Sequence, residues 1–266
     1  MDNFLKFLLI LWGIFILFLL YEIFDYIKFK YYLKKIEQKP CWCKKTLLQI
    51  DLYNRLPDNL KEIMEYKIKR FIFEKTFIPR YLELTDEMKI MTAFYACLPT
   101  LAYKNFCYPS LKYIYIYPHT IIKKHIEQYH GIIQKEMLIS GESVGDSVII
   151  AWDEAKRDIF KYKKRNVIIH EFAHELDFED GMVDGIPIFA HNDYGHFKEV
   201  FNETYKKASK ERIIDDYAYT NYAEFLAVTT EYFFLKPNTL KSHYPELYEE
   251  YKKIFKFDPE ILEEKG

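Results

Sequence analysis

A long hydrophobic stretch, Phe4–Tyr21, begins the pattern of apolar and polar positions, and its only charged residue is Lys6. Its length is close to the roughly 20 apolar residues that a membrane-spanning helix needs. A cleaved signal peptide would end in small residues, whereas the residues after Tyr21 are large, aromatic and charged. The pattern therefore predicts a single-pass anchor at residues 1–27, a linker at 28–46 and one domain at 47–260.

Lysines are distributed unequally around this stretch. One lysine precedes most of it, and four follow it: Lys28, Lys30, Lys34 and Lys35. Positive charge near a membrane span favours the cytoplasmic side, so we expect the domain in the cytoplasm. The four cysteines are then expected to be reduced thiols.

Beyond residue 47 most of the pattern has the period of a helix. Helical spacing of apolar residues predicts helices at 58–75, 85–98, 166–177, 193–210, 222–235 and 246–256. Alternation of period two predicts strands at 113–117, 137–140 and 147–152. We therefore expect an α+β domain with a small mixed or antiparallel sheet. The strand at 147–152 is either an ordinary core strand or an edge strand that pairs with a bound peptide.

The sequence His-Glu-Phe-Ala-His at 170–174 lies inside an apolar helical pattern. His170 and His174 are one turn apart on the same face of a helix, so both rings can bind one metal ion. Glu171 lies beside such an ion, where it can take a proton from a bound water. The alternative is a core helix with two hydrogen-bonded histidines. The spacing favours a catalytic zinc site.

A catalytic zinc needs a third protein ligand and one open position. Asp180 has the short spacing of one known ligand pattern, but the glycine that permits its sharp turn is absent. Glu224 and Glu231 lie two turns apart on a later, largely apolar helix, where an unpaired carboxylate is costly to bury. The residues alone leave Glu224 and Glu231 equally suitable, with Asp180 behind them.

Several blocks of the sequence resemble, in order, the Mlc titration factor A family of zinc-dependent peptidases. The clearest are NVIIHEFAHELD at 166–177, DG at 180 and at 184, DYAYTNYAEF at 216–225 and EYFF at 231–234. The resemblance extends from about residue 47 to 259. It implies a zincin-like, gluzincin-type metallopeptidase domain. One departure is Tyr222, which stands where the family often has proline.

The resemblance also implies roles for single residues. His170, His174 and Glu224 would be the ligands of one zinc ion, and Glu171 the general base. Tyr217 would donate a hydrogen bond to the oxyanion of the tetrahedral intermediate. Two further acids, Glu231 and Asp177, are candidates to orient a ligand histidine through its other ring nitrogen.

These features predict a membrane-anchored, zinc-dependent enzyme that hydrolyses peptide bonds. The resemblance implies an aminopeptidase and a regulatory protein partner, because family members act on small substrates and bind a transcriptional repressor. The alternative function is a membrane-tethered, zinc-stabilised binding protein that sequesters such a partner. The net charge of −2 gives no reason to expect nucleic acid as a partner.

Overall fold

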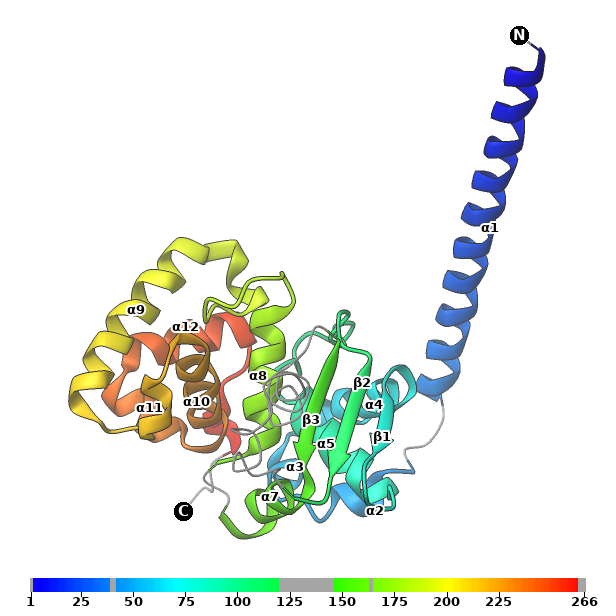
Figure 1. The fold of residues 1–266 in the computed structure, drawn as a ribbon. Coiled ribbons are helices and arrows are strands. Elements are labelled where there is room, and N and C mark those ends of the chain that lie inside the picture. The colour runs from blue at the N-terminus through cyan, green and yellow to red at the C-terminus, as the bar shows by residue number, and fades with distance from the viewer. Residues whose placement is uncertain (1, 39–41, 120–145, 163–164, 263–266) are drawn as a thin grey trace, which may run out of the picture. The chain divides into compact units, whose positions relative to one another are not determined.

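The computed structural model describes residues 2–38, 42–119, 146–162 and 165–262 (Figure 1). The chain divides into two compact units, Met1–Cys41 and Trp42–Gly266. In the first, the described residues form one helix, α1 (Asp2–Gln38), most of whose apolar side chains are exposed. Its segment Phe4–Gln38 is long and apolar enough to cross a membrane, judged by length and composition.

The second unit is mainly helical. Its described α-helices are α2 (Lys44–Leu47), α3 (Asp51–Arg55), α4 (Asp58–Glu74), α5 (Asp86–Cys97), α7 (Trp152–Arg157), α8 (Val167–Phe178), α9 (Tyr194–Glu211), α10 (Tyr222–Leu235), α11 (Pro237–His243) and α12 (Pro245–Phe255). Shorter helical turns occupy Asp158–Tyr162, Ile188–Asp193, Asp216–Tyr219 and Pro259–Leu262. The predicted helix at 222–235 coincides with α10, and the other predicted helices match observed ones to within a few residues.

The described strands form one sheet in the order β1-β2-β3, with β1 at Thr76–Pro79, β2 at Tyr113–Tyr117 and β3 at Ser147–Ala151. All the pairs between the described strands are parallel, so the antiparallel pairing that we expected is not found among them. Parallel neighbours require a crossover connection, and α5 lies in the connection from β1 to β2. The sequence pattern missed β1, a four-residue strand. The strand predicted at 137–140 lies outside the described residues.

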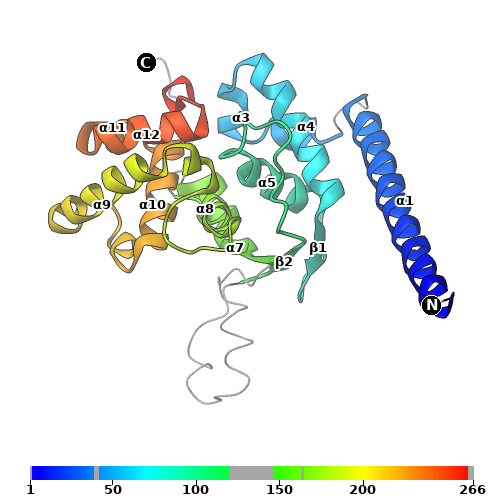
Figure 2. The ribbon, with the colours of Figure 1, turned by 90° about the horizontal axis from the view of Figure 1, so that it is seen from above.

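Helix α8 lies in the middle of this unit. Figure 1 shows it between the sheet and the group α9–α12, and Figure 2 shows the same order from above, with α4 and α5 on the side of the sheet. α8 packs on α10 and also contacts α5 and β3. Phe172 of α8 is fully buried, and its ring contacts those of Phe71 and Tyr108. The hydrophobic face of α8 therefore fixes the helix in the core, which leaves its other face to α10.

Two buried lysines hold the segment that precedes β2. The Nζ of Lys67 donates to the carbonyl oxygens of Tyr103 and Phe106, at 2.8 Å each. Lys75 does the same for Tyr108 and Leu111, at 2.7 and 2.8 Å. Burial lowers the pKa of both amines. These hydrogen bonds join α4 and the residue that follows it to the turns before β2, where the carbonyl oxygens of Tyr103 and Tyr108 also accept backbone N–H groups.

One of the described cysteines is not the reduced thiol that we expected. Cys43 is disulfide-bonded. Cys97 and Cys107 are free and buried, and burial raises the pKa of both thiols, that of Cys97 to about 12.

Candidate metal centre

The start of α8 is fixed by three side chains. Asn166 caps the helix, because its side-chain oxygen accepts hydrogen bonds from the N–H groups of Ile168 and Ile169 at 3.1 Å each. Asp158 accepts from the N–H of Val167 at 3.0 Å. Glu231 of α10 accepts from the N–H of Asn166 at 2.6 Å. The N–H groups that open a helix are thereby paired, and α8 is tied to α10.

Burial opposes the ionisation of Asp158. It raises the pKa of this carboxyl to about 6, although the hydrogen bond from Val167 and the charge of Arg165 act in the other direction. The folded state therefore binds a proton at Asp158 more tightly than the unfolded state does. Ionisation of Asp158 as the pH rises from about 4 to about 6 lowers the free energy of unfolding.

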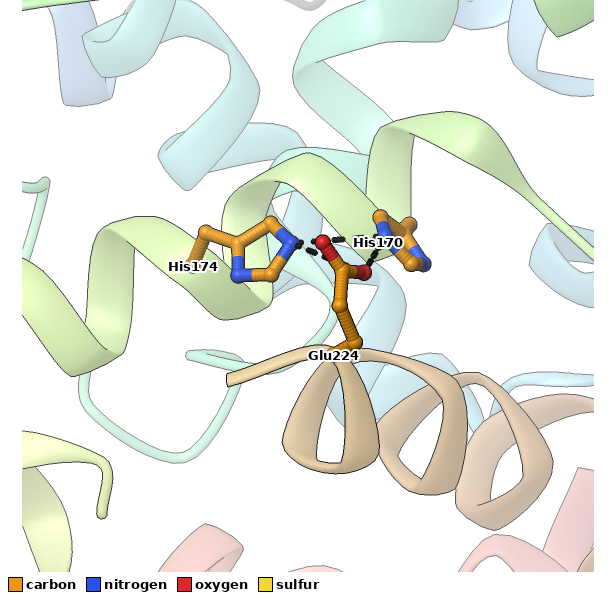
Figure 3. A group of neighbouring side chains, drawn as sticks. All are labelled: His170, His174 and Glu224. Carbon is orange, nitrogen blue, oxygen red and sulfur yellow. Dashed lines mark hydrogen bonds and ion pairs between the residues drawn. The ribbon is translucent and has the colours of Figure 1, made fainter. Parts of the chain in front are cut away.

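The start of α10 brings a carboxylate to α8. Asn221 caps α10 by accepting a hydrogen bond from the N–H of Glu224 at 2.9 Å, which places Glu224 in the first turn. Figure 3 shows the Glu224 side chain pointing from α10 to His170 and His174 of α8. Their side chains are 13% exposed for His170 and 16% for the other two, so the group is open on one side.

The donor atoms of these three residues have the spacing of metal ligands. Glu224 Oε2 lies 3.0 Å from His170 Nε2 and 3.6 Å from His174 Nε2, and the two Nε2 atoms are 3.3 Å apart. Tetrahedral coordination with bonds of about 2.0–2.1 Å separates neighbouring donors by about 3.3 Å. In the described part of the chain, this is the one group of three or more such donors. Two imidazoles and a carboxylate at this spacing fit a zinc ion, with one position open.

Glu231 contacts the other nitrogen of the same histidine. Its Oε1 lies 2.9 Å from His170 Nδ1. A proton on Nδ1, shared with this carboxylate, leaves the lone pair of Nε2 for a metal ion. The structure thus gives Glu224 and Glu231, which the residues alone could not separate, different contacts. Glu224 lies at Nε2, among the donors, and Glu231 lies behind the ring.

This arrangement shifts the pKa values of His170 and Glu224. Burial lowers its pKa, but the hydrogen bonds with Glu224 and Glu231 outweigh burial and raise the pKa of His170 to about 10. Burial likewise opposes the ionisation of Glu224, yet the two histidines hold the pKa of Glu224 well below its usual range. Without a metal the group therefore holds a proton between His170 and Glu224, at the point where a cation would replace it.

The two residues expected to act on substrate also lie here. Glu171 lines the same cavity as the donor atoms, and burial raises its pKa against the opposing charges of His170 and His174. Tyr217 is 54% exposed, and its hydroxyl donates to Glu224 Oε1 at 3.2 Å. The cavity has a volume of about 580 Å³, which lies in the range of ligand sites.

Two acids that the sequence also suggested lie elsewhere. Asp180 Oδ1 accepts from the N–H of Met182 and is not in the donor group. Asp177 accepts from the N–H groups of Gly185 and Ile186, at 2.9 Å each. It therefore holds the turn after α8, and of the two candidates to orient a ligand histidine, Glu231 is the one that contacts His170.

The sequence pattern did not identify several other residues that lie at or near the site. Arg165 and Lys236 line the cavity, although nothing in their sequence neighbourhood marks them as site residues. Asn166 and Asp158 position α8, and an asparagine before an apolar run is a recognised cap signal for the first of these.

The sequence was compared with known families and proteins. It matches the family described as glucose-regulated metallo-peptidase M90 over residues 27–256. An uncharacterized protein of Synechocystis sp., slr2042, is 31% identical over 226 residues, which cover 80% of this chain and 82% of the relative. Mlc titration factor A of Pectobacterium atrosepticum is 28% identical over 225 residues, 80% of this chain and 84% of the relative. Mlc titration factor A of Salmonella arizonae is 26% identical over 246 residues, which cover 88% of this chain and 98% of the relative. The chain therefore belongs to the family of M90 metallopeptidases and Mlc titration factor A, as the resemblance of its sequence predicts.

Proposed function

We propose that this protein is a zinc-dependent peptidase, with His170, His174 and Glu224 as ligands and Glu171 as general base. The observation that carries the proposal is the tetrahedral spacing of three donor atoms from α8 and α10, beside the half-buried Glu171 in an open cavity. A purely structural zinc site would fill its fourth position with a protein ligand and would have no use for a base.

The residues around the site have the properties that peptide hydrolysis needs. Bound zinc supplies a Lewis acid that polarises a peptide carbonyl and acidifies water. Glu171 accepts a proton from the attacking water and returns it to the leaving amine, a transfer that its burial and raised pKa favour. Tyr217, whose hydroxyl already reaches the Glu224 carboxylate, donates a hydrogen bond to the oxygen on which negative charge develops.

Two further features support substrate turnover. Glu231 keeps the His170 ring in the orientation and tautomer that a ligand requires. Strand β3 is last in the order of the described sheet and contacts α8. Its outer edge can accept the backbone of a peptide as an added strand, as the sequence suggested for residues 147–152.

The test uses the full chain purified in detergent. We expect about one zinc per chain by mass spectrometry in the wild type. Glu171→Gln should keep the zinc and lose about 10²–10⁴-fold in peptide cleavage, because only the proton transfer is removed. Glu224→Ala should lose the zinc, whereas Asp180→Ala, a carboxylate of the nearby turn, should keep it. A wild-type chain that binds no zinc, or Glu171→Gln with unchanged turnover, would rule out the proposal.

The names of the relatives support a second activity. Several are called Mlc titration factor A, a name that indicates the titration of another protein. We infer that a regulatory protein is a partner of this chain as well. If Glu171→Gln retained zinc and full biological effect in cells, binding of that partner rather than hydrolysis would be the function.

We further propose that α1 anchors the protein as a single span and that the domain at 47–260 lies in the cytoplasm. The apolar length of α1 supports the span, and the lysines that follow its apolar part support the orientation. Protease added outside intact cells should then leave the domain uncut, and its digestion would contradict this orientation.

A further inference from the structure

The cavity beside the candidate metal centre has a second end, where α8 begins and α10 ends. Glu231 of α10 reaches Asn166 at the start of α8, whereas Glu224, two turns earlier, reaches the donor histidines. The two helices therefore run antiparallel. Arg165 precedes Asn166 and Lys236 directly follows α10, so both cations lie at this second end, and both line the cavity.

Neither cation is held in a close pair with a carboxylate in the contacts that the structure describes. Arg165 has a side chain 63% exposed, and its Nε is 3.9 Å from Asp158 Oδ1, the limit of an ion pair. Lys236 Nζ lies 4.0 Å from the centre of the Tyr232 ring, and this ring also lines the cavity. The ring holds the ammonium group at the cavity wall by a cation–π contact. Both charges remain available to a ligand.

The other acids of the cavity, by contrast, already have partners. Asp215 Oδ1 accepts a hydrogen bond from the N–H of Tyr217 at 3.0 Å and caps the turn that carries this tyrosine. Glu154 Oε1 lies 3.7 Å from Arg157. Apart from the histidines, Arg165 and Lys236 are the cationic side chains among the described residues that line this cavity, and both lie at its second end.

We propose that Arg165 and Lys236 form a subsite for a carboxylate of the peptide substrate, so that the enzyme selects acidic peptides. The inference rests on the proposed function, because zinc and Glu171 define where the scissile bond lies. Along α10, Glu231 is about 10 Å and Lys236 about 18 Å from Glu224. An extended peptide advances about 3.3 Å per residue, so the selected carboxylate lies about three to five residues from the scissile bond.

A carboxylate at that distance has two sources, an acidic side chain or the α-carboxylate of a short peptide. Quenched-fluorescence peptides distinguish them. One series carries glutamate, glutamine or lysine at each position on either side of the cleaved bond, and each peptide is made with a free or an amidated C-terminus. Loss of the preference on amidation assigns the α-carboxylate, whereas a preference for glutamate over glutamine assigns a side chain.

The variants are Arg165→Gln, Lys236→Gln, their combination and the double charge reversal to glutamate. Each neutral variant should lower kcat/KM for the preferred peptide about fivefold, mainly through KM, as for one partly exposed charge pair. The loss should shrink at high salt. The double reversal should shift the preference to lysine peptides. Lys210→Gln removes one exposed lysine from α9, outside the cavity, and should change nothing.

Binding provides a second readout that does not depend on turnover. The same peptides, bound to the Glu171→Gln chain and followed by fluorescence anisotropy, should show the same order of preference. Cleavage without preference for a carboxylate, or a preference that survives both neutral variants, would overturn the subsite. If the wild type cleaves nothing but binds acidic peptides through Arg165 and Lys236, the subsite stands and the proposed hydrolysis fails. Chains that neither bind nor cleave any peptide would overturn both.

Discussion

Replacing Glu231 with glutamine changes only the group behind the candidate ligand His170. The Glu231 carboxylate accepts two hydrogen bonds, from His170 Nδ1 at 2.9 Å and from the N–H of Asn166 at 2.6 Å. Glutamine has one carbonyl oxygen and one NH₂ group, so it can accept only one of them. If its oxygen faces Asn166, its NH₂ donates to Nδ1 and forces the proton of His170 onto Nε2, the atom that a metal needs. If it turns around, two donors face each other at Asn166.

The loss of zinc affinity in either arrangement can be estimated. Loss of a hydrogen-bond partner behind a metal-bound histidine typically weakens metal affinity by about 10- to 100-fold. This corresponds to about 1.4–2.8 kcal/mol. Substitution of Glu224, which lies among the donor atoms themselves, should cost much more, since the zinc would lose one of its three protein ligands.

The assay is a competition for zinc between the metal-free chain and a chromophoric chelator. The matched control is Glu250→Gln, because Glu250 is also a buried glutamate, 4% exposed, paired with Lys253 and His196 away from the metal centre. We expect Glu250→Gln to lower thermal stability without a change in zinc affinity. A zinc affinity of Glu231→Gln equal to that of the wild type would refute the role assigned to Glu231.

Three further predictions concern stability. Burial raises the pKa of Asp158 to about 6, so the free energy of unfolding of Asp158→Asn should rise relative to the wild type by about 2 kcal/mol from pH 4 to pH 6. Urea unfolding at each pH measures this difference, and a difference that does not change with pH would contradict the prediction. Gly185→Ala should lower the free energy of unfolding by about 2 kcal/mol or more, because Gly185 has φ +81° and a Cβ would lie 2.7 Å from the carbonyl oxygen of Tyr222. Gly181→Ala, with φ +82° and open space around it, is its control and should cost less, so equal losses would remove the steric part of the argument. Lys67→Met should lose about 1–3 kcal/mol in the same unfolding assay, since the carbonyl oxygens of Tyr103 and Phe106 lose their hydrogen bonds from Nζ. A variant as stable as the wild type would show that these bonds contribute nothing.

The helices could be predicted because their signals are local. Asn221 before an apolar run and Pro237 after it mark the two ends of α10, and the same logic marks α8 from Asn166. The direction of the strands is not a local property. It depends on the connection between them, and one of the two partners of β2 is the four-residue strand β1, which is too short for an alternating pattern to be recognised. The parallel pairing of the described strands could therefore not be predicted from the pattern.

The candidate donors could be named for a similar reason. His170 and His174 are related by one turn of a single helix, so their spacing alone brings them together. Arg165 and Lys236 line the same cavity only because α8 and α10 run antiparallel, which no sequence spacing records. The same holds for Asp177, whose hydrogen bonds to the turn at Gly185 depend on where that turn folds back.

The choice between Glu224 and Glu231 shows how far spacing can decide a site. Seven residues on a helix return to the same face, so both glutamates point toward α8 and either could have been the ligand. The position of His170 along the axis of α10 gives the two glutamates different roles. The ring lies between them and presents Nε2 to Glu224 and Nδ1 to Glu231. One histidine thus uses both carboxylates, one among the donors and one to hold the ring. One face of α10 therefore supplies both the candidate ligand and the carboxylate that orients the His170 ring. This requires that α10 does not slide along its axis relative to α8. The bond from Glu231 to the N–H of Asn166 serves that purpose, since it joins α10 to the first turn of α8.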